Sequence, residues 1–283
     1  MKKKIIQITS KILLKIGGNY LRHSPTMYKF ADKIVKKMAT SNEVFEIQGF
    51  RMKRGKTTRL MILTGEHEPA TTDLIKSIVK PGMSVFDLGA NIGWFTLILS
   101  KLVGINGHVY AFEPVPYLFE ILKENIQLNG LQNVSIFPLA LSNKTGVGKL
   151  TLNSFQDGDN RLGSESIKSN SIDVEITTID AFCKKHNTKI DFLKMDIQGS
   201  EPKALEGMMT TILQNPQIKI VTEFWLPAII DLGSSPKDFL DSLENLGFSI
   251  NEIEGNKSYK LTPIKKEKLL ETQTDVNLFC YRP

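Results

Sequence analysis

The feature that most constrains the fold of this chain is a regular alternation of strand-like and helix-like segments from about residue 70 to its end. Short apolar runs rich in β-branched and aromatic residues alternate with longer runs whose apolar residues recur at helical spacing. This pattern predicts an α/β fold, a mainly parallel sheet with helices on both faces. The expected strands are 84–88, 108–113, 134–139, 190–196, 217–224, 248–253 and 276–281, and the expected helices are 71–79, 92–103, 115–129, 201–213 and 236–246.

Three segments stand outside this alternation. Apolar residues at helical spacing in the first forty residues predict a basic amphipathic helical extension over 1–43, ahead of one domain over 44–283. Residues 44–64 predict short strands around the basic loop RMKRGKTTR. Between residues 146 and 180, the alternating runs GKLTLN and IDVEITT predict a hairpin inserted between the two halves of the domain.

Charge is concentrated at the N-terminus. Residues 1–60 contain 11 Lys and 4 Arg against three acidic residues, a net charge of +12, while the remainder carries −6 and the whole chain +6. Such a basic segment predicts contact with lipid headgroups or nucleic acid, or else a solvated basic face. The first helix could lie in a membrane interface, but docking on the domain is the more common use of such an apolar stripe.

The composition argues against a membrane span, a signal peptide and a metal centre. No run approaches the roughly 18 consecutive apolar residues of a span, and polar residues interrupt the apolar stretch near the N-terminus. We therefore expect a cytoplasmic protein, with peripheral contact to an anionic membrane surface as one option. Cys183 and Cys280 belong to no CxxC or Cys/His cluster, which predicts buried thiols and no metal site.

The segment VFDLGANIGWFTLILS, residues 85–100, combines an apolar strand, a glycine turn and an apolar helix. Gly89 and Gly93 allow a tight turn and a close approach of a ligand to the free amides of a helix N-terminus. The middle glycine of a G-x-G-x-x-G motif is missing, which disfavours a pyrophosphate, while Asp87 suits a ligand with a charged amine. The segment predicts a nucleotide-type cradle.

The next two strands extend this prediction. The second ends at Glu113, a carboxylate placed to accept both hydroxyls of a ribose. The third ends in FPLALSN, where the backbone around Ala140 and Leu141 can flank an adenine. A glycine turn, a ribose carboxylate and an apolar third position together predict an adenosine that carries an amino acid, which describes S-adenosylmethionine.

Several segments resemble, in order, those of FkbM-type methyltransferases: VFDLGANIGWFTL, VYAFEPVPYLFEILKENIQLN, LALSN, TTIDAF and IDFLKMDIQGSEPKALEG. The resemblance covers about residues 65–255. It implies a Rossmann-like class I methyltransferase fold with a seven-stranded sheet, its last strand antiparallel, and S-adenosylmethionine as cofactor. By position it implies these contacts to the cofactor: Asp87, Gly89, Asn91 and Gly93 at the methionine part, Glu113 at the ribose, Leu141 and Asn143 near the adenine, and Glu68 from the segment before the first strand.

The stretch KMDIQGSE, residues 194–201, ends the fourth strand and is the predicted catalytic segment. Methyl transfer needs alignment and removal of the acceptor's proton, and Asp196 lies where open sheets bind ligands. Lys194 alternates onto the same side of the strand and is expected to pair with Asp196. Gly199 is expected to turn the chain, and Ser200 to cap the helix that Glu201 begins.

Gln198 and Glu223 complete the predicted site. The family resembled here usually has Glu at position 198, and an amide can hold a hydroxyl but cannot take its proton. Acid–base work then falls to Asp196 or to Glu223, which ends the fifth strand in VTEFW. Alternatively, this strand end has only a structural role, in which the aromatic pair of VTEFW closes the hydrophobic core.

The sequence therefore predicts an O-methyltransferase that acts on a hydroxyl of a sugar, glycolipid or other small molecule. An RNA methyltransferase is the alternative that the basic N-terminal segment supports, although DIQG stands where base-amine methyltransferases carry an NPPY-like tetrapeptide. A second alternative, a module that binds S-adenosylmethionine without catalysis, is supported by Gln198.

Overall fold

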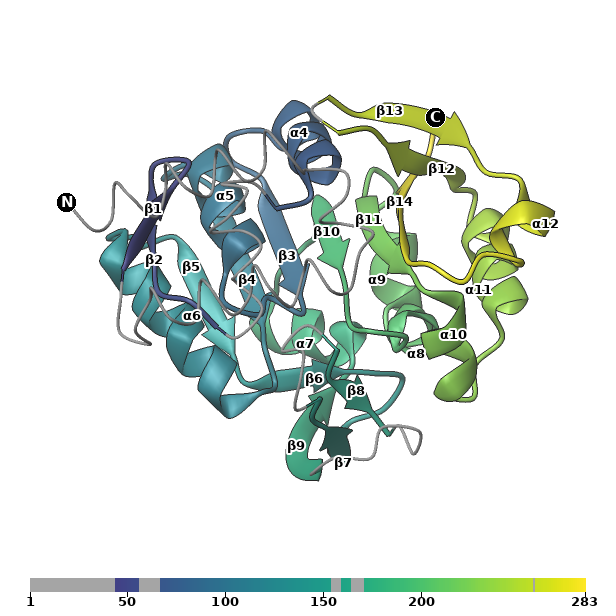
Figure 1. Cartoon of the computed structure of the whole chain (residues 1–283), viewed down its shortest axis with the longest axis horizontal. Helices are drawn as coiled ribbons and strands as arrows, with labels where there is room; N and C mark the ends of the chain where they lie inside the picture. The colour runs from purple at the N-terminus through teal and green to yellow at the C-terminus, as the bar shows by residue number, and fades with distance from the viewer. Residues whose placement is uncertain (1–43, 56–66, 154–158, 164–170, 257) are drawn as a thin grey trace, which may run out of the picture.

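The computed structural model describes residues 44–55, 67–153, 159–163, 171–256 and 258–283. The predicted extension over 1–43 and the second half of the loop RMKRGKTTR lie outside these residues. The described part contains a large sheet between two layers of helices, with a smaller sheet at one end of the molecule (Figure 1). The predicted α/β architecture, with helices on both faces of a mixed sheet, is confirmed.

The strands of the large sheet are β3 (Ser84–Leu88), β4 (His108–Phe112), β5 (Val134–Phe137), β10 (Phe192–Met195), β11 (Lys219–Phe224), β12 (Ser249–Glu254), β13 (Lys260–Pro263) and β14 (Val276–Tyr281). Across the described residues their order is β13-β12-β14-β11-β10-β3-β4-β5. The five from β11 to β5 are parallel, and β14 runs antiparallel to β11, as expected of the last strand.

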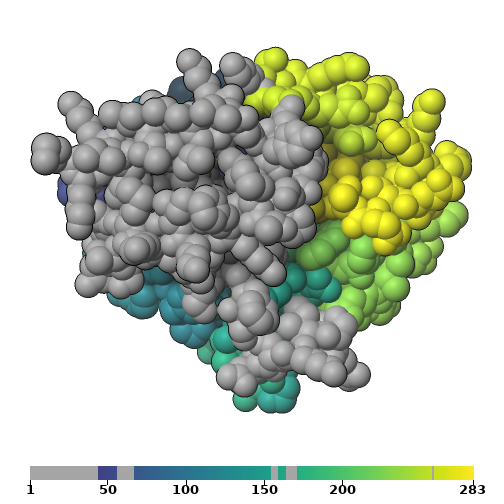
Figure 2. Space-filling model, viewed as in Figure 1, coloured from purple at the N-terminus to yellow at the C-terminus, as the bar shows by residue number. Residues whose placement is uncertain are grey.

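The described part of this sheet has eight strands, not the predicted seven. The additional strand, β13, pairs antiparallel with β12 at the edge of the sheet. This strand is short and polar, so it lacks the apolar alternation by which strands are identified in a sequence. It ends in Pro263, which is tolerated because the strand lies at the edge of the sheet. The C-terminal residues, yellow in Figure 2, gather on one side of the molecule.

Helices cover both faces because successive strand residues point to opposite sides. Val85 and Phe192 belong to a core that also contains buried residues of α4, α5 and α6, whereas Phe86 and Leu193 belong to the core of the later helices. The helices are α4 (Pro69–Ile78), α5 (Trp94–Val103), α6 (Pro116–Leu128), α7 (Ile179–His186), α8 (Glu201–Glu206), α9 (Met209–Gln214), α10 (Leu226–Asp231), α11 (Pro236–Asn245) and α12 (Lys266–Leu269).

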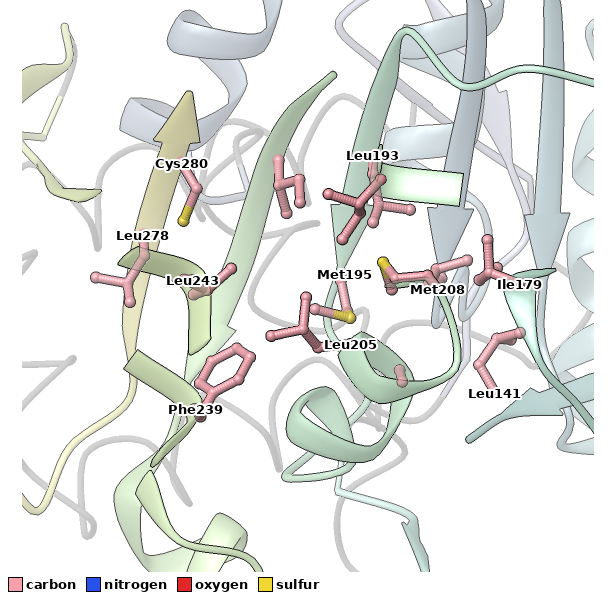
Figure 3. Close-up of a cluster of buried hydrophobic side chains, with 14 of the residues drawn as sticks. Leu141, Ile179, Leu193, Met195, Leu205, Met208, Phe239, Leu243, Leu278 and Cys280 are labelled. Atoms are coloured by element: carbon pink, nitrogen blue, oxygen red, sulfur yellow. The ribbon is translucent and has the colours of Figure 1, made fainter. Parts of the chain in front are cut away.

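Figure 3 shows the second of these cores. Leu193 and Met195 of β10 lie among Leu205 of α8, Phe239 of α11 and Met208 between α8 and α9, and all five side chains are almost completely buried. Each such side chain contributes about 1.5–3 kcal/mol relative to an exposed one. This packing holds β10 rigidly, so the polar residues that follow it start from a fixed position.

One predicted helix, 201–213, is two helices in the structure. Helix α8 ends before Gly207, and α9 begins two residues later. A Cβ atom on residue 207 would overlap the carbonyl oxygen of Ser142, so the break lets the segment after β6 pass close to the chain. The glycine within the predicted helix was the available signal for this break.

The predicted insert over 146–180 forms a second sheet together with Leu139–Leu141, which precedes it. Its strands are β6 (Leu139–Leu141), β7 (Gly146–Thr151), β8 (Arg161–Leu162) and β9 (Ser171–Thr177), in the order β6-β9-β7-β8 within the described residues. The predicted hairpin of β7 and β9 is confirmed. Strands β1 (Phe45–Ile47) and β2 (Phe50–Met52) form a separate antiparallel pair, so short strands in this region are confirmed. Their turn is at Gln48–Gly49 and β2 includes Arg51 and Met52, so the pair does not enclose the basic loop as predicted.

Both cysteines, Cys183 and Cys280, are free and buried, as predicted. Among the helices that the structure describes, none has the length and apolar character needed to cross a membrane.

Candidate active site

A cavity of about 370 Å³ lies at the carboxyl ends of the parallel strands β3, β4, β10 and β11. Its volume is in the range of about 300–1,000 Å³ that is usual for small-molecule sites, and its place is where open α/β sheets bind ligands. It brings together most of the predicted site residues: Glu68, Gly89, Asn91, Glu113, Leu141, Lys194, Asp196 and Glu223.

Three predicted site residues do not line this cavity, and each has another contact. Asp87 is fully buried and accepts a hydrogen bond from Thr96 Oγ1 at 2.6 Å. Gly93 packs against helix α6, where a Cβ atom would stand 2.6 Å from Leu122 Cδ1. The Asn143 side chain donates to Glu206 Oε2 at 2.7 Å and is held outside the cavity.

The glycine turn after β3 forms one wall of the cavity. Gly89 has a φ of 78° and Asn91 a φ of 51°, and the amide of Gly89 donates to the carbonyl of Phe112 at 3.0 Å. A Cβ atom on residue 89 would overlap the carbonyl oxygen of Asp196. Glycine is therefore required at this position both for its conformation and for the close approach of β3 to the tip of β10.

Glu113 joins this turn to the loop after β4. Its Oε2 accepts from the amide of Asn91 at 2.8 Å and its Oε1 from the amide of Val115 at 2.9 Å. Burial raises the pKa of Glu113 to about 7, although the two amides lower it in part. A carboxylate has about four acceptor positions. Two remain for the hydroxyls of a ligand, so the predicted ribose contact fits this geometry.

Lys194 is the buried cation of the site. Its Nζ lies 3.2 Å from Asp196 Oδ2, 3.9 Å from Asp87 Oδ1 and 5.0 Å from the centre of the Phe95 ring. Burial alone would lower the pKa of Lys194, but the Asp196 and Asp87 carboxylates outweigh it and raise the pKa above its ordinary value. The predicted pairing of Lys194 with Asp196 is confirmed.

Gln198 connects two carboxylates, a contact that the sequence did not indicate. Its Nε2 donates to Asp196 Oδ1 at 2.6 Å and to Glu223 Oε2 at 3.0 Å. The residue has a φ of 55°, so the turn holds it in the left-handed region. A glutamate at this position would bring three carboxylates together without a donor between them. The amide thus matches its surroundings better than the usual acid of the family resembled.

The turn that holds Gln198 is fixed by Glu201, not by the predicted cap. Ser200 Oγ makes no hydrogen bond within the described part of the chain, so its predicted capping role is wrong. Instead the Glu201 carboxylate accepts from the amides of Ile197 and Gly199, each at 2.8 Å. Burial raises the pKa of Glu201 to about 7. Gly199 turns the chain as predicted, with a φ of 95°.

Glu223 and Glu68 also line the cavity. Burial, followed by the charges of Asp196 and Glu201, raises the pKa of Glu223 well above its ordinary value. Glu68 Oε2 accepts from Asn277 Nδ2 at 2.9 Å, and its Oε1 lies 3.3 Å from the His67 ring nitrogen.

Other lining residues were missed. His67, Trp94, Phe95 and Ser200 also line the cavity, as do Leu162 of β8 and Asn160 just before it. The aromatic pair directly follows the glycine turn in GWF, which was the one sequence signal for it. Across the ranges that the structure describes, no group of three or more His, Cys, Asp or Glu residues is arranged to hold a metal ion.

Two family profiles match this chain. Residues 87–250 match the sequence profile of the methyltransferase FkbM domain, and residues 24–139 match that of protein-L-isoaspartate(D-aspartate) O-methyltransferase. The methyltransferase sdnD of Sordaria araneosa is 26% identical over 200 residues, which are 59% of this chain and 73% of that protein.

Other similarities are more local or more distant. A ribosomal protein L11 methyltransferase of Caldanaerobacter subterraneus is 41% identical over 76 residues, which are 26% of this chain, and the chain spans only 24% of that relative's length. The solved structure of methyltransferase FkbM from Methylobacillus flagellatus is 15% identical with a TM-score of 0.49, covering 94% of this chain and 60% of that one.

Proposed function

Because the chain belongs to the FkbM methyltransferase family, we propose that it transfers the methyl group of S-adenosylmethionine to a hydroxyl oxygen of a sugar, glycolipid or other small molecule. S-adenosylmethionine is the cofactor of this family. We choose oxygen as the atom that accepts the methyl group because two carboxylates, Asp196 and Glu223, lie at the cavity and are joined by Gln198.

The residues present fit this cofactor. The backbone of Gly89 and Asn91 would hold its methionine part, Glu113 its ribose, and Ala140 with Leu141 its adenine. The cavity lining has several carboxylates against one buried ammonium, an arrangement that suits a ligand with a net positive charge. When bound, the cofactor supplies a methyl group on a positively charged sulfur.

The chain's own residues then have two tasks. The first is alignment, since an in-line displacement is accelerated chiefly by holding the reacting atoms in position. The second is to accept the proton that a hydroxyl loses as its oxygen gains the methyl group. A carboxylate at the end of β10 or β11 meets this need. Lys194 and Gln198 hold the Asp196 carboxylate in a fixed orientation.

The charge of the cavity supports a neutral acceptor. Glu68, Asp196 and Glu223 all line the cavity, and only Lys194 and His67 among its described lining residues can carry a positive charge. Phosphate groups are repelled by such a lining, which weighs against RNA. A polyhydroxylated acceptor offers hydroxyl donors to the carboxylates and apolar C–H surface to Trp94 and Phe95.

The proposed acceptors include membrane-linked glycans. The net charge of +12 over residues 1–60 supports a cytoplasmic enzyme that meets an anionic membrane surface. Sedimentation with vesicles tests this: more protein should bind vesicles with anionic lipid than neutral vesicles, and equal binding to both would contradict it.

Transfer of an isotope-labelled methyl group tests the proposed reaction. The full chain is incubated with labelled S-adenosylmethionine and, in parallel, with fractionated cell glycans, glycolipids, RNA and protein. We expect label in a glycan or glycolipid fraction, in a bond that resists mild base as a methyl ether does and an ester does not. Label confined to RNA or protein would overturn the proposed acceptor class.

A further inference from the structure

Asp196 and Glu223 differ in how much of each carboxylate is engaged. Asp196 uses both oxygens: Oδ1 accepts from Gln198 at 2.6 Å and Oδ2 from Lys194 at 3.2 Å. Glu223 uses one, since Oε2 accepts from Gln198 at 3.0 Å and no donor from the described residues reaches Oε1. Glu223 lines the cavity and is only partly buried. Its second oxygen is therefore the open acceptor of the pair.

The charges that face Glu223 are mostly negative. Asp196 at the tip of β10, Glu201 on α8, Asp275 before β14 and Glu68 before α4 all raise the pKa of Glu223, after burial itself. Lys194, the cation of this cluster, is engaged by Asp196 and Asp87. Before the cofactor binds, this environment favours the protonated form of Glu223.

We infer that Glu223 is the residue that takes the proton of the acceptor, that Gln198 positions it by holding Oε2, and that entry of the cationic cofactor drives off the proton that Glu223 carries beforehand. The inference rests on the proposed function. It follows from electrostatics, because a positive charge brought into the cavity favours the carboxylate form of a group that lines it.

The protons and electrons of the step balance. The acceptor's O–H bond breaks and its proton goes to Glu223 Oε1. The acceptor oxygen forms a bond to the methyl carbon as the bond from that carbon to sulfur breaks, with the electron pair staying on sulfur. The products are a methyl ether, S-adenosylhomocysteine and protonated Glu223. Because S-adenosylhomocysteine is a neutral thioether, the site returns to the protonation state of the empty cavity.

Proton release on binding tests this without an acceptor. Calorimetry in buffers of different ionisation enthalpy counts the protons exchanged when the full chain binds S-adenosylmethionine or S-adenosylhomocysteine. We expect S-adenosylmethionine to release more, by up to about one proton per molecule bound. By thermodynamic linkage, a ligand that releases protons on binding binds more tightly as pH rises. The affinity for S-adenosylmethionine should therefore increase relative to that for S-adenosylhomocysteine as pH rises.

Two variants test whether Glu223 is the source of the additional proton that S-adenosylmethionine releases. Glu223→Gln keeps an oxygen that accepts from Gln198 but cannot carry the proton, so the difference between the two ligands should fall to well below its wild-type value. Glu113→Gln is the matched control, because Glu113 lines the same cavity and burial also raises its pKa. In that variant the difference per bound molecule should persist, even where binding is weaker.

A third variant tests the positioning role of Gln198 through the pH dependence of proton release. Gln198→Met removes the donor to Glu223 Oε2 at similar side-chain length, so the pH at which proton release is half complete should move upward. An unchanged midpoint would remove Gln198 from the inference.

Equal proton counts for the two ligands in the wild type would overturn the inference, as would a difference that is undiminished in Glu223→Gln. If that variant fails to fold, an NMR titration of the Glu carboxyl carbons of the wild type decides: one raised pKa should fall with S-adenosylmethionine and not with S-adenosylhomocysteine. No heat at all with S-adenosylmethionine would overturn the proposed function, and the inference with it, whereas equal proton counts leave the proposed function standing.

Discussion

Gly89 lies against the carbonyl oxygen of Asp196, so close that no side chain fits between them. The turn after β3 and the tip of β10 therefore meet at the wall of the cavity. Gly89→Ala should destabilise the protein by about 2–4 kcal/mol, because the new methyl group overlaps the chain and the left-handed φ adds strain. Urea unfolding measures the loss, and calorimetry should show no binding of S-adenosylmethionine.

A matched variant separates overlap from strain. Gly82 has a φ of 85°, similar to that of Gly89, but a Cβ atom there would meet nothing within 4 Å. Gly82→Ala should cost only about 1–2 kcal/mol and leave cofactor binding intact. If the two variants behave alike, the contact between Gly89 and Asp196 has no special importance.

Much of the large sheet could be predicted from the sequence because its signals are local. Strands β3 and β4 have apolar runs bounded by turn residues, and their predicted bounds agree within one residue. Parallel strands place their carboxyl ends at one edge, which is why Glu113, Asp196 and Glu223 could be grouped before the cavity was known.

The remaining features depend on contacts between distant segments. The bridge from Gln198 to Glu223 requires β10 and β11 to be neighbours in register, and the capping of the turn by Glu201 requires the buried position of that side chain. Asn143 was expected near the cofactor, but its bond to Glu206 depends on where α8 packs. No short sequence pattern indicates such contacts between distant residues.

Lys194 is predicted to be essential for stability. Lys194→Met leaves the carboxylates of Asp87 and Asp196 without their ammonium, and breaking a buried ion pair in this way costs about 3–5 kcal/mol. Urea unfolding should show this loss at neutral pH. The control is Lys149→Met, which removes an exposed pair with Asp173 and should cost less than about 1 kcal/mol. A similar small cost at Lys194 would contradict the buried cluster.

Stability should decrease as pH rises from mildly acidic to neutral. Burial raises the pKa of Glu113 from 4.5 to about 7 and acts likewise on Glu201, so the folded chain binds more protons than the unfolded chain between those values. Unfolding free energy therefore falls across this window, by up to roughly 3 kcal/mol for each carboxyl. Unfolding measured at a series of pH values should show it, with a shallower slope in Glu113→Gln. A rise in stability over the same window would contradict the burial of these acids.

Cofactor affinity should distinguish Glu113 from Asn143. Glu113→Ala removes both the proposed ribose contact and the link between two loops, so S-adenosylmethionine should bind at least about tenfold more weakly, a loss of about 1.4 kcal/mol or more. Asn143→Ala should change the affinity by less than about twofold, since the side chain lies outside the cavity. Calorimetry on both variants measures this, and the reverse order would mean that the cofactor lies elsewhere.

The identity of the atom that receives the methyl group is the most direct test of the account. The full chain is incubated with S-adenosylmethionine carrying an isotope-labelled methyl group and a glycan extract, and NMR of the purified product identifies the atom bonded to the labelled carbon. We predict a methyl group on oxygen, formed by the wild type and reduced by at least about a hundredfold in Glu223→Gln, a typical loss for a general base. A labelled methyl group on nitrogen or carbon, or one formed equally well by the variant, would contradict it.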